Sequence, residues 1–492
     1  MANLIDHLVY QAHFDPKAIA LQDLERQLTF GQLFFLVKRI ASKLRQAGIK
    51  PGDIVITSFL DNYLDWIITL ALFHEATITC GNHGYAPIDG SIDYDWIITD
   101  SAKDYFDPDK TILVDNDWIA DAQNQSYEID QFNYESSDSV PRLILTSGTT
   151  GQNKVVPWNI GVCNVQVITT LRNFGCTAST LSLFGNSTGI GFKIAYASLV
   201  MGYTYYCTVN PDHAIKMMNR FSIESIVASP QQISAVINNL ESSGKSVSSL
   251  KSVWYAGGPL TPRMLGLIEK HLSTNIVNCY GATEVGLVSC FKPNRNVSLL
   301  AVGYPLVAGD YLIQIVDASH EPLPVGEEGL VRIKTPEMAH EYYNDPEATA
   351  ESYRDGWFYS GDRGRLLKNG LLVLAGRDSE LINLGGPKID PVLIDQVLID
   401  YPGIQDAAVF GLENKLGRQQ VAAAIVVSDN FDLESLRKEL LSKLGQESTP
   451  TIFFRLDRIP RNQMGKAMRA QMSRHFEEVM AKQGAEKDAQ AT

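Results

Sequence analysis

The sequence predicts an α/β protein that is built from more than one domain. Short apolar runs with strand character alternate with segments of helical periodicity, and this alternation is typical of α/β domains. The chain has 492 residues, whereas single hydrophobic cores stop growing at about 250–300 residues. We therefore expect a large N-terminal α/β domain followed by a smaller second domain.

The first elements follow the alternating pattern. Thr29 is expected to cap a helix from Gly31 to Ala47, because apolar residues recur there at helical spacing and Gly48 can end the helix. After a Pro-Gly turn, Ile54–Ser58 is expected to be a strand. The apolar run Trp66–Phe73 is expected to be the next helix.

The middle of the chain predicts further strands, each ending at a glycine or proline turn. The candidates are Ser222–Ser229, Ser252–Ala256 and Asn275–Cys279. Ligands of α/β sheets usually lie beyond the carboxyl ends of strands, so the residues after these runs are candidates for a site. From about Val302 to Ile333 short strands and turns replace the alternation, which predicts a small β-subdomain.

A second break falls at Gly376-Arg377-Asp378, and the residues beyond it are enough for a separate domain. Asp390 and Pro391 are expected to begin a helix that runs to Ile399. Further expected elements are strands at Ala407–Gly411 and Val421–Val427 and a helix at Leu433–Leu444. The expected organisation is an N-terminal domain at 1–376, a hinge at 377–379, a C-terminal α+β domain at 380–480 and a polar, frayed tail at 481–492.

The composition excludes several functional classes. With 45% hydrophobic residues and a net charge of −14, the chain resembles ordinary globular proteins and lacks the basic balance of nucleic-acid or anionic-membrane binders. We find no apolar run long enough for a transmembrane helix and no signal peptide. The six cysteines are scattered, so they are expected to be reduced thiols in a cytoplasmic protein without a metal cluster.

One glycine- and hydroxyl-rich segment predicts a phosphate site. It follows the apolar run Leu143–Leu145 and consists of Thr146, Ser147, Gly148, Thr149, Thr150, Gly151, Gln152, Asn153 and Lys154. Glycines let several backbone N–H groups converge on an anion, and the hydroxyl groups and the lysine add donors and charge. Taken alone, the segment fits a Ser/Gly-rich surface loop equally well.

This segment resembles the phosphate loop of the adenylate-forming superfamily, which includes acyl-CoA synthetases, adenylation domains of peptide synthetases and luciferases. The family usually has proline where this chain has Asn153. Four further motifs of the family follow in order: Gly257-Gly258-Pro259-Leu260, Tyr280-Gly281-Ala282-Thr283-Glu284, Tyr359-Ser360-Gly361-Asp362 with Arg377, and the segment from Pro460 to Arg469 that contains Lys466. Each motif is weak alone, but their order and spacing cover nearly the whole chain, more loosely before Val140.

The resemblance implies a role for each motif. Residues 146–151 and Lys154 would hold the phosphates of ATP. Gly257, Gly258, Pro259, Tyr280 and Gly281 would surround the adenine, and Asp362 and Arg377 would bind the ribose. Thr283 would contact the α-phosphate, Glu284 would hold Mg²⁺, and Lys466 would be the catalytic lysine that bridges the substrate carboxylate and the α-phosphate.

The resemblance also implies a reaction in two halves. A carboxylic acid is first converted to its acyl-adenylate, and a thiol then displaces AMP. The thiol would be CoA or, alternatively, the phosphopantetheine of a separate carrier protein; a luciferase-like oxidase is a remote alternative. In the family the C-terminal domain rotates between the halves, here about Ser379, where relatives usually have aspartate or lysine. Gly385 and Gly386 would then line the thiol tunnel.

The predicted acid-binding residues follow from the same alignment. Asn186 falls where amino-acid-activating relatives have an aspartate, so an α-amino acid is disfavoured, and relatives that activate aryl acids have asparagine there. A helix cap is an equally good interpretation of Asn186. The other expected pocket walls are small or apolar and favour an aryl or short-to-medium acyl group: Ser187, Ile190, Cys279, Leu287 and Val288.

Overall fold

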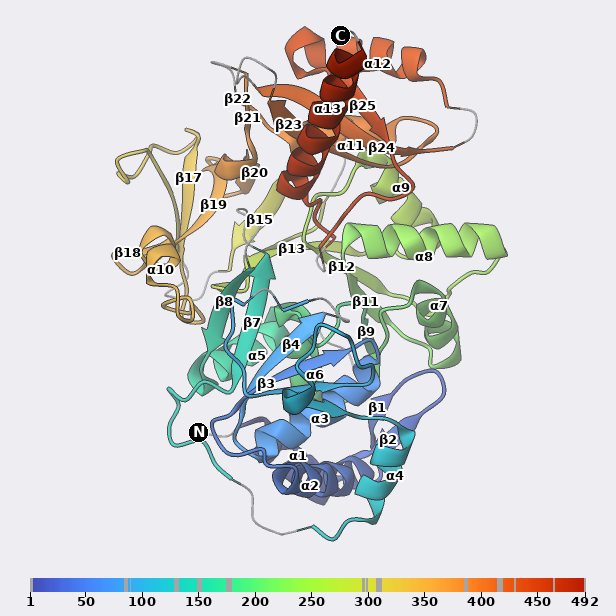
Figure 1. The fold of residues 1–492 in the computed structure, drawn as a ribbon, viewed down its shortest axis with the longest axis vertical. Helices are drawn as coiled ribbons and strands as arrows, with labels where there is room; N and C mark the ends of the chain where they lie inside the picture. The colour runs from blue at the N-terminus through green and yellow to red at the C-terminus, as the bar shows by residue number, and fades with distance from the viewer. Residues whose placement is uncertain are drawn as a thin grey trace.

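The computed structural model describes residues 3–83, 87–88, 90–127, 132–147, 153–173, 179–293, 297, 300–306, 312–384, 388–413, 419–428, 431–462 and 465–490. Within these residues, strands and helices alternate in a large N-terminal part, and a smaller part with its own sheet follows (Figure 1). The predicted fold class is confirmed. No helix among the described residues is long and apolar enough to cross a membrane.

The helices begin where the sequence supplies caps. Thr29 accepts a hydrogen bond from the Gln32 N–H at the start of α2, and Asp61 and Thr188 cap α3 and α6 in the same way. The helices are α1 (Leu4–Phe14), α2 (Phe30–Gln46), α3 (Asn62–His74), α4 (Asn116–Asn124), α5 (Ile160–Asn173), α6 (Gly189–Met201), α7 (Pro211–Arg220), α8 (Pro230–Ser243), α9 (Pro262–His271), α10 (Pro346–Ser352), α11 (Pro391–Asp400), α12 (Leu433–Ser448) and α13 (Arg469–Gln490), with short 3-10 turns η1 (Pro108–Lys110) and η2 (Asp378–Glu380).

One sheet has the order β6-β5-β3-β4-β7-β8 and is parallel except for the final hairpin of β7 and β8. Its strands are β3 (Ile54–Phe59), β4 (Ile78–His83), β5 (Trp96–Thr99), β6 (Thr111–Leu113), β7 (Arg142–Ser147) and β8 (Asn153–Trp158). The hairpin pairs Thr146 with Lys154, so the two ends of the predicted phosphate loop lie side by side.

A second, larger sheet changes character along its length. From β1 to β13 it is largely parallel, and from β13 to β16 it is antiparallel in the order β13-β14-β15-β20-β19-β17-β16, which contains the predicted β-subdomain. Its strands are β1 (Ile19–Gln22), β2 (Gln27–Thr29), β9 (Thr180–Ser182), β10 (Tyr205–Cys207), β11 (Ser225–Ala228), β12 (Ser252–Ala256), β13 (Ile276–Ala282), β14 (Gly286–Phe291), β15 (Ala301–Pro305), β16 (Leu312–Val316), β17 (Gly329–Lys334), β18 (Tyr353–Arg354), β19 (Trp357–Leu366) and β20 (Leu372–Arg377).

The C-terminal part has its own sheet and core. The strands are β21 (Ile382–Asn383), β22 (Lys388–Ile389), β23 (Ile404–Glu413), β24 (Gln419–Val427) and β25 (Ile452–Arg455). α11 and α12 cover one face of the β23–β24 pair, and Met472 and Phe476 of α13 pack on the other. α13 continues to Gln490, so the tail that we expected to be frayed from residue 481 is helical in its backbone up to that residue.

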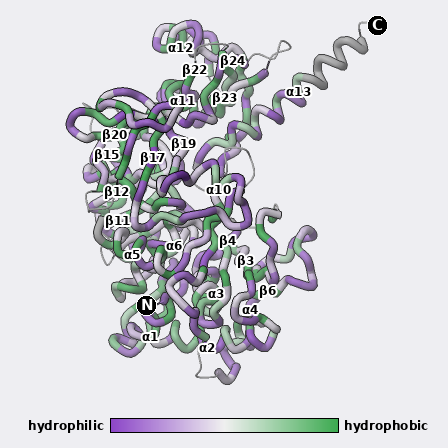
Figure 2. The backbone as a smooth tube through the Cα atoms, turned by 90° about the vertical axis from the view of Figure 1, so that its left-hand side faces the viewer, coloured by the Kyte–Doolittle hydropathy of each residue, from purple (hydrophilic) through white to green (hydrophobic). Residues whose placement is uncertain are grey.

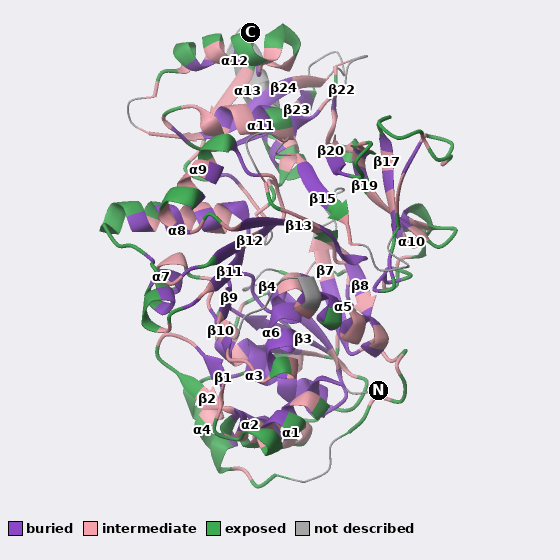
Figure 3. Ribbon diagram, turned by 180° about the vertical axis from the view of Figure 1, so that it is seen from behind, coloured by how far each residue is buried: buried purple, intermediate pink, exposed green. Residues whose placement is uncertain are grey.

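The two parts are arranged one above the other. The C-terminal elements lie over α8, α9 and β13, and the β-subdomain flanks them (Figure 1). Buried residues concentrate in the central strands β11 and β12, whereas α4 and α12 are largely exposed (Figure 3). Hydrophobic segments alternate with hydrophilic turns along the chain, and α13 extends away from the body (Figure 2). The carboxyl ends of β12 and β13 therefore face the junction of the two parts.

Candidate active site

A cavity of about 720 Å³ lies at this junction. Its lining combines β7, β8, α6, the ends of β12 and β13, the β19–β20 hairpin and the loop before α13. Among the predicted residues, it is lined by Thr146, Lys154, Ile190, Gly257, Cys279, Gly281, Thr283, Glu284, Leu287, Arg377 and Lys466. Residues from five separate motifs, more than three hundred positions apart in the chain, thus share one space.

Glu284 lies just beyond β13 in a buried polar cluster. Its Oε1 accepts a hydrogen bond of 2.8 Å from the Tyr342 hydroxyl. The Lys154 ammonium lies 4.7 Å from the centroid of the same tyrosine ring. Tyr342 therefore connects the predicted phosphate-binding lysine to the predicted metal-binding carboxylate.

The neighbouring Thr283 is held by Trp158. The indole Nε1 donates a hydrogen bond of 3.0 Å to the Thr283 carbonyl oxygen. Trp158 is fully buried and lies on the same face of β8 as Lys154, because side chains alternate along a strand. This bond fixes the backbone of the Thr283-Glu284 pair against the sheet that carries the phosphate loop.

Glu284 offers a site that fits a magnesium ion. Glu284 Oε2 has no hydrogen bond within the described residues, and the side chain lines the cavity. Mg²⁺ takes oxygen ligands and is usually held by one or two carboxylates together with substrate phosphates and water. Among the described residues no group of three or more His, Cys, Asp or Glu side chains could hold a metal ion. The Glu284 carboxylate therefore fits a magnesium ion whose other ligands would be phosphate oxygens of the substrate and water.

Asp362 and Arg377 meet across the β19–β20 hairpin, where they are directly paired. Asp362 Oδ1 accepts a hydrogen bond of 3.2 Å from Arg377 Nε, and Oδ2 accepts one of 2.6 Å from the Tyr280 hydroxyl. Burial and the adjacent carboxylate raise the pKa of Tyr280 well above its usual range, so its hydroxyl remains a donor. Arg377 lines the cavity, whereas Tyr280, Asp362, Gly258 and Pro259 are not among its lining residues.

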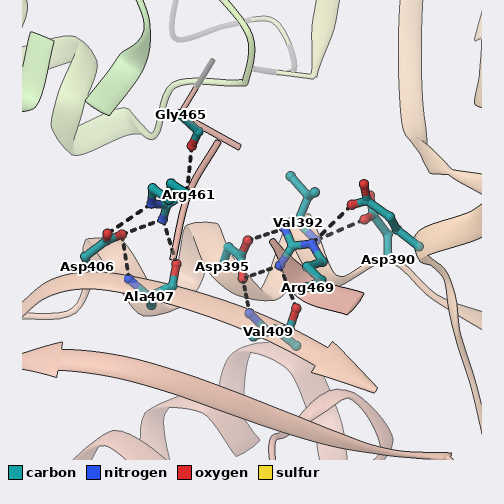
Figure 4. Close-up of polar contacts among 10 residues, drawn as sticks. Asp390, Val392, Asp395, Asp406, Ala407, Val409, Arg461, Gly465 and Arg469 are labelled. Atoms are coloured by element: carbon teal, nitrogen blue, oxygen red, sulfur yellow. Dashed lines mark hydrogen bonds and ion pairs between the residues drawn. The ribbon is translucent and has the colours of Figure 1, made fainter. Parts of the chain in front are cut away.

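The loop that carries Lys466 is braced on both sides (Figure 4). Before it, Arg461 forms an ion pair of 2.5 Å with Asp406 and donates to the Gly465 carbonyl oxygen. After it, Arg469 forms an ion pair of 2.6 Å with Asp395. Both acids belong to the C-terminal part, so Lys466 extends from a loop that is rigidly attached to its own domain.

Gly465 allows the loop to pack closely against the N-terminal part. Its φ of +75° lies in the left-handed region that favours glycine. A Cβ at this position would collide with Gln231 Oε1 on α8. The absence of a side chain therefore lets the loop approach α8 and brings Lys466 to the cavity.

Lys466 faces positive charge within the cavity. The Arg377 guanidinium is the main cause that lowers the pKa of Lys466 to about 8, and the acids Asp362, Glu380 and Glu284 oppose this shift. Lys466 itself remains exposed to solvent. An ammonium next to a guanidinium is less stable than one beside an anion. A bound anion such as a phosphate would therefore be stabilised by both cations.

This pKa predicts the pH dependence of the first half-reaction. Lys466 is cationic below its pKa of about 8 and neutral above it. We expect kcat/KM for ATP in pyrophosphate exchange to fall about tenfold per pH unit above that pKa, because only the cation neutralises developing negative charge. Lys466→Arg is the control, since arginine stays charged, and its profile should lack this alkaline limb. If kcat/KM for ATP fell in the same way above about pH 8 in wild-type protein and in Lys466→Arg, a group other than Lys466 would be responsible.

The end of the cavity that is predicted to bind the acid has walls from α6, β13 and β14. Ile190, Cys279 and Leu287 line it, and they pack in one hydrophobic cluster with Phe184. Val288 follows Leu287 on β14 and points to the opposite face, where it packs in the core of the β-subdomain. The prediction that Val288 lines the pocket was therefore wrong, because neighbouring strand residues point to opposite sides.

Asn186 does not reach the cavity. It is fully buried, its Nδ2 donates to the Asn62 carbonyl oxygen at 2.9 Å, and its Oδ1 accepts from the Tyr205 hydroxyl at 2.6 Å. It does not cap α6 either, because Thr188 is the cap. Both interpretations of Asn186 were wrong: its side chain joins α3 to β10. Ser187 is likewise buried against Gly81 and is absent from the lining.

Asn186→Ala is therefore expected to affect stability rather than acid selection. The change leaves the buried Tyr205 hydroxyl and the Asn62 carbonyl without this partner, and we expect a loss of about 2–4 kcal/mol in the free energy of unfolding. Urea denaturation measures this loss. Asn124→Ala, at the exposed end of α4, is the control and should cost less than about 0.5 kcal/mol. A changed acid preference with unchanged stability would contradict the assignment.

Other predicted residues cannot be placed. Gly148, Thr149, Thr150 and Gly151 of the phosphate loop and Gly385 and Gly386 of the proposed thiol tunnel lie outside the described residues. Ser147 is placed at the end of β7. Ser379, the predicted pivot, lies in η2 and lines the cavity.

The sequence analysis missed several site residues. Trp158 could have been found, since strand periodicity places it on the same face as Lys154. Lys193 could also have been found, because it is the one charged residue of the apolar helix α6. Tyr342 belongs to no motif and gives no signal of its contact with Glu284, because 58 positions separate the two residues.

A large α/β domain whose nucleotide-type site receives a lysine from a small C-terminal domain defines the architecture of adenylate-forming enzymes. The chain belongs to the AMP-binding enzyme family: the model of that name matches residues 95–343, and the model of the AMP-binding enzyme C-terminal domain matches residues 393–466. The resemblance stated from the motifs is thus confirmed.

Individual relatives match over nearly the whole chain. The 4-chlorobenzoate–CoA ligase of Arthrobacter sp. is 27% identical over 95% of this chain and 94% of its own. The o-succinylbenzoate CoA synthetase of Bacillus subtilis, solved with its acyl-adenylate intermediate, has a TM-score of 0.80 at 23% identity and covers 95% of this chain and 97% of its own. Its complex with ATP and a magnesium ion has a TM-score of 0.79 at 22% identity, covering 94% and 98%.

Proposed function

We propose that this protein is an acid–thiol ligase that uses ATP and Mg²⁺ to convert an aryl or short-to-medium acyl carboxylic acid to its acyl-adenylate and then transfers the acyl group to CoA. One observation carries the proposal: Thr283, Glu284, Arg377 and Lys466 line a single cavity although they come from two domains. The relatives named above as CoA ligases or synthetases favour CoA over a carrier protein as the acceptor.

In the first half-reaction a carboxylate oxygen bonds to the α-phosphorus of ATP and the bond to pyrophosphate breaks. The acid is already ionised near neutral pH, so the site needs no general base. Thr283 and Lys466 hold the reacting oxygens, Lys154 neutralises the phosphates, and Asp362 with Arg377 fixes the ribose. Magnesium, when bound at Glu284, supplies charge neutralisation for the phosphates.

In the second half-reaction a thiol sulfur bonds to the acyl carbon, the bond to AMP breaks, and the thiol proton passes to solvent. The structure has the Lys466 loop seated against α8 through Gly465, which suits the first half-reaction. Rotation of the C-terminal domain about the segment 377–379 would then withdraw Lys466 before the thiol enters.

Acid-dependent exchange of labelled pyrophosphate into ATP tests the first step across a panel of aryl, fatty, dicarboxylic and amino acids. We expect exchange with aryl or short-to-medium acids and none with α-amino acids. Acyl-CoA formation is then compared with acylation of a phosphopantetheine-loaded carrier protein, and oxygen uptake is followed in parallel. Exchange without acyl-CoA would contradict the proposed acceptor, and absence of exchange with every acid would contradict the function.

A further inference from the structure

Two cysteines lie directly opposite each other in the larger sheet. Cys279 of β13 pairs with Cys290 of the antiparallel strand β14. Residues that are directly opposed in two paired strands project from the same face of the sheet. In agreement with this, both side chains pack in one hydrophobic cluster, which also contains Leu287. Cys279 and Leu287 line the cavity, so the two thiol groups are neighbours on the face of the sheet that borders it.

The spacing of antiparallel strands suits a disulfide bond between these residues. Directly opposed residues have Cα atoms about 4.5–5.5 Å apart, and disulfide-linked residues usually have Cα atoms about 4.4–6.8 Å apart. The Cβ atoms of opposed residues are about 4.5–5.5 Å apart, whereas a disulfide needs about 3.5–4.5 Å. Cys279 and Cys290 are both thiols in this structure. A disulfide would therefore draw β13 and β14 together by about 1 Å.

The two thiols differ in their access to solvent. Cys290 is half-buried and is not among the residues that line the cavity, whereas Cys279 is only 5% exposed and lines it. The other described cysteines, Cys80, Cys163 and Cys207, are buried, and burial raises the pKa of their thiols. Oxidants react with the thiolate form. Among the described cysteines, an oxidant in solution therefore reaches Cys290 most readily.

β13 connects this pair to the residues of the proposed reaction. The strand runs from Cys279 to Ala282, and Thr283 and Glu284 follow directly and line the cavity. The pairing of β13 with β14 is already irregular between Tyr280 and Gly281. A displacement of about 1 Å in groups that position a substrate can lower a rate about 100-fold. Movement of β13 towards β14 would therefore disturb both a wall of the cavity and the Thr283-Glu284 pair.

We propose that Cys279 and Cys290 form a site of reversible oxidation, at which a disulfide bond displaces β13 and inactivates the enzyme. The oxidant is hydrogen peroxide. The Cys290 sulfur attacks one peroxide oxygen, the O–O bond breaks, and a sulfenic acid and water are formed. The Cys279 sulfur then bonds to the Cys290 sulfur and displaces the hydroxyl group as a second water. The two thiols lose two electrons, the peroxide gains them, and both thiol protons end in water.

The disulfide itself does not depend on the proposed function, but the expected loss of activity rests on it. Reduced and peroxide-treated protein are alkylated, digested with trypsin and compared by mass spectrometry, and pyrophosphate exchange is measured on the same samples. We expect the peptide that contains both cysteines to be two hydrogens lighter after oxidation and to resist alkylation. We expect kcat/KM for the acid to fall about 100-fold. Dithiothreitol should restore both, because thiol–disulfide exchange reverses the bond.

Cys290→Ser is the decisive variant, because this residue lies outside the cavity lining. Its exchange should equal that of reduced wild-type protein and should resist peroxide; Cys290→Ala serves if the serine variant does not fold. Cys163→Ala is the matched control, since Cys163 is a buried cysteine of α5, and it should stay as sensitive as wild-type protein.

Three results would overturn the inference: no disulfide in oxidised wild-type protein, a disulfide without loss of exchange, or an equal loss of exchange in Cys290→Ser. If reduced protein catalysed no exchange with any acid, the proposed function would be contradicted. The peptide masses would still decide whether Cys279 and Cys290 form the disulfide.

Discussion

Replacing Lys466 by alanine is expected to lower acid-dependent pyrophosphate exchange by about 100- to 1,000-fold, as loss of a preorganised donor in the transition state usually does. The ammonium lines the cavity with Thr283, Glu284 and Arg377. Lys466 and Arg461 are the cations beyond residue 379 that line the cavity among the described residues, and the proposed function assigns the neutralisation of the reacting phosphate to Lys466. Steady-state exchange with saturating ATP and acid measures the change in kcat.

Two controls separate this effect from damage to the domain. Lys443→Ala removes a half-exposed lysine of α12 that pairs with Glu439, and exchange should stay at the wild-type rate. Transfer from preformed acyl-adenylate to CoA should be much less affected in Lys466→Ala, because the proposed function assigns Lys466 to the first step alone. If exchange survived at the wild-type rate, the catalytic assignment of Lys466 would be wrong.

Asp362→Ala is expected to raise the KM for ATP by about 10- to 100-fold, which corresponds to the loss of one or two hydrogen bonds to a charged group. The carboxylate is positioned by Tyr280 and Arg377, and each of its oxygens keeps capacity to accept a ribose hydroxyl. Its removal also leaves the cationic Arg377 without its closest acid. Initial rates over a range of ATP concentrations measure the effect.

Tyr280→Phe tests the support of Asp362 separately. It removes the 2.6 Å hydrogen bond but leaves the carboxylate and the ring, so its effect on the KM for ATP should be smaller than that of Asp362→Ala. The KM for the acid should change little in either variant. An unchanged KM for ATP in Asp362→Ala would refute the ribose role.

Those predicted nucleotide-site residues that line the cavity could be found from the sequence because their signals are local. The glycine turn at Gly257, the acid in Thr283-Glu284 and the lysine after Gly465 stand beyond strand ends or in loops, where the sequence shows them as isolated polar or turn residues. Helix and strand positions were also predictable, since caps such as Thr29 and the periodicity of α2 act over a few residues.

The acid-binding half could not be predicted in the same way. Whether Asn186 or Lys193 reaches the cavity depends on how α6 is rotated and on which buried partners it meets, and those partners lie on α3, β8 and β10. The side chain of Val288 was misplaced because the register of β14 against β13 decides its direction. A pattern within one segment carries no information about such contacts.

The order of the motifs along the chain was therefore sufficient to predict the fold class and the family. Each motif consists of turn-forming and charged residues that are adjacent in the sequence, so it can be recognised without the tertiary structure. The cavity itself, with Lys466, Glu284, Tyr342, Trp158 and Lys193 all in its lining, arises only when distant elements pack. The physical reason is that side-chain direction and burial are set by long-range packing, which acts between residues that the sequence keeps far apart.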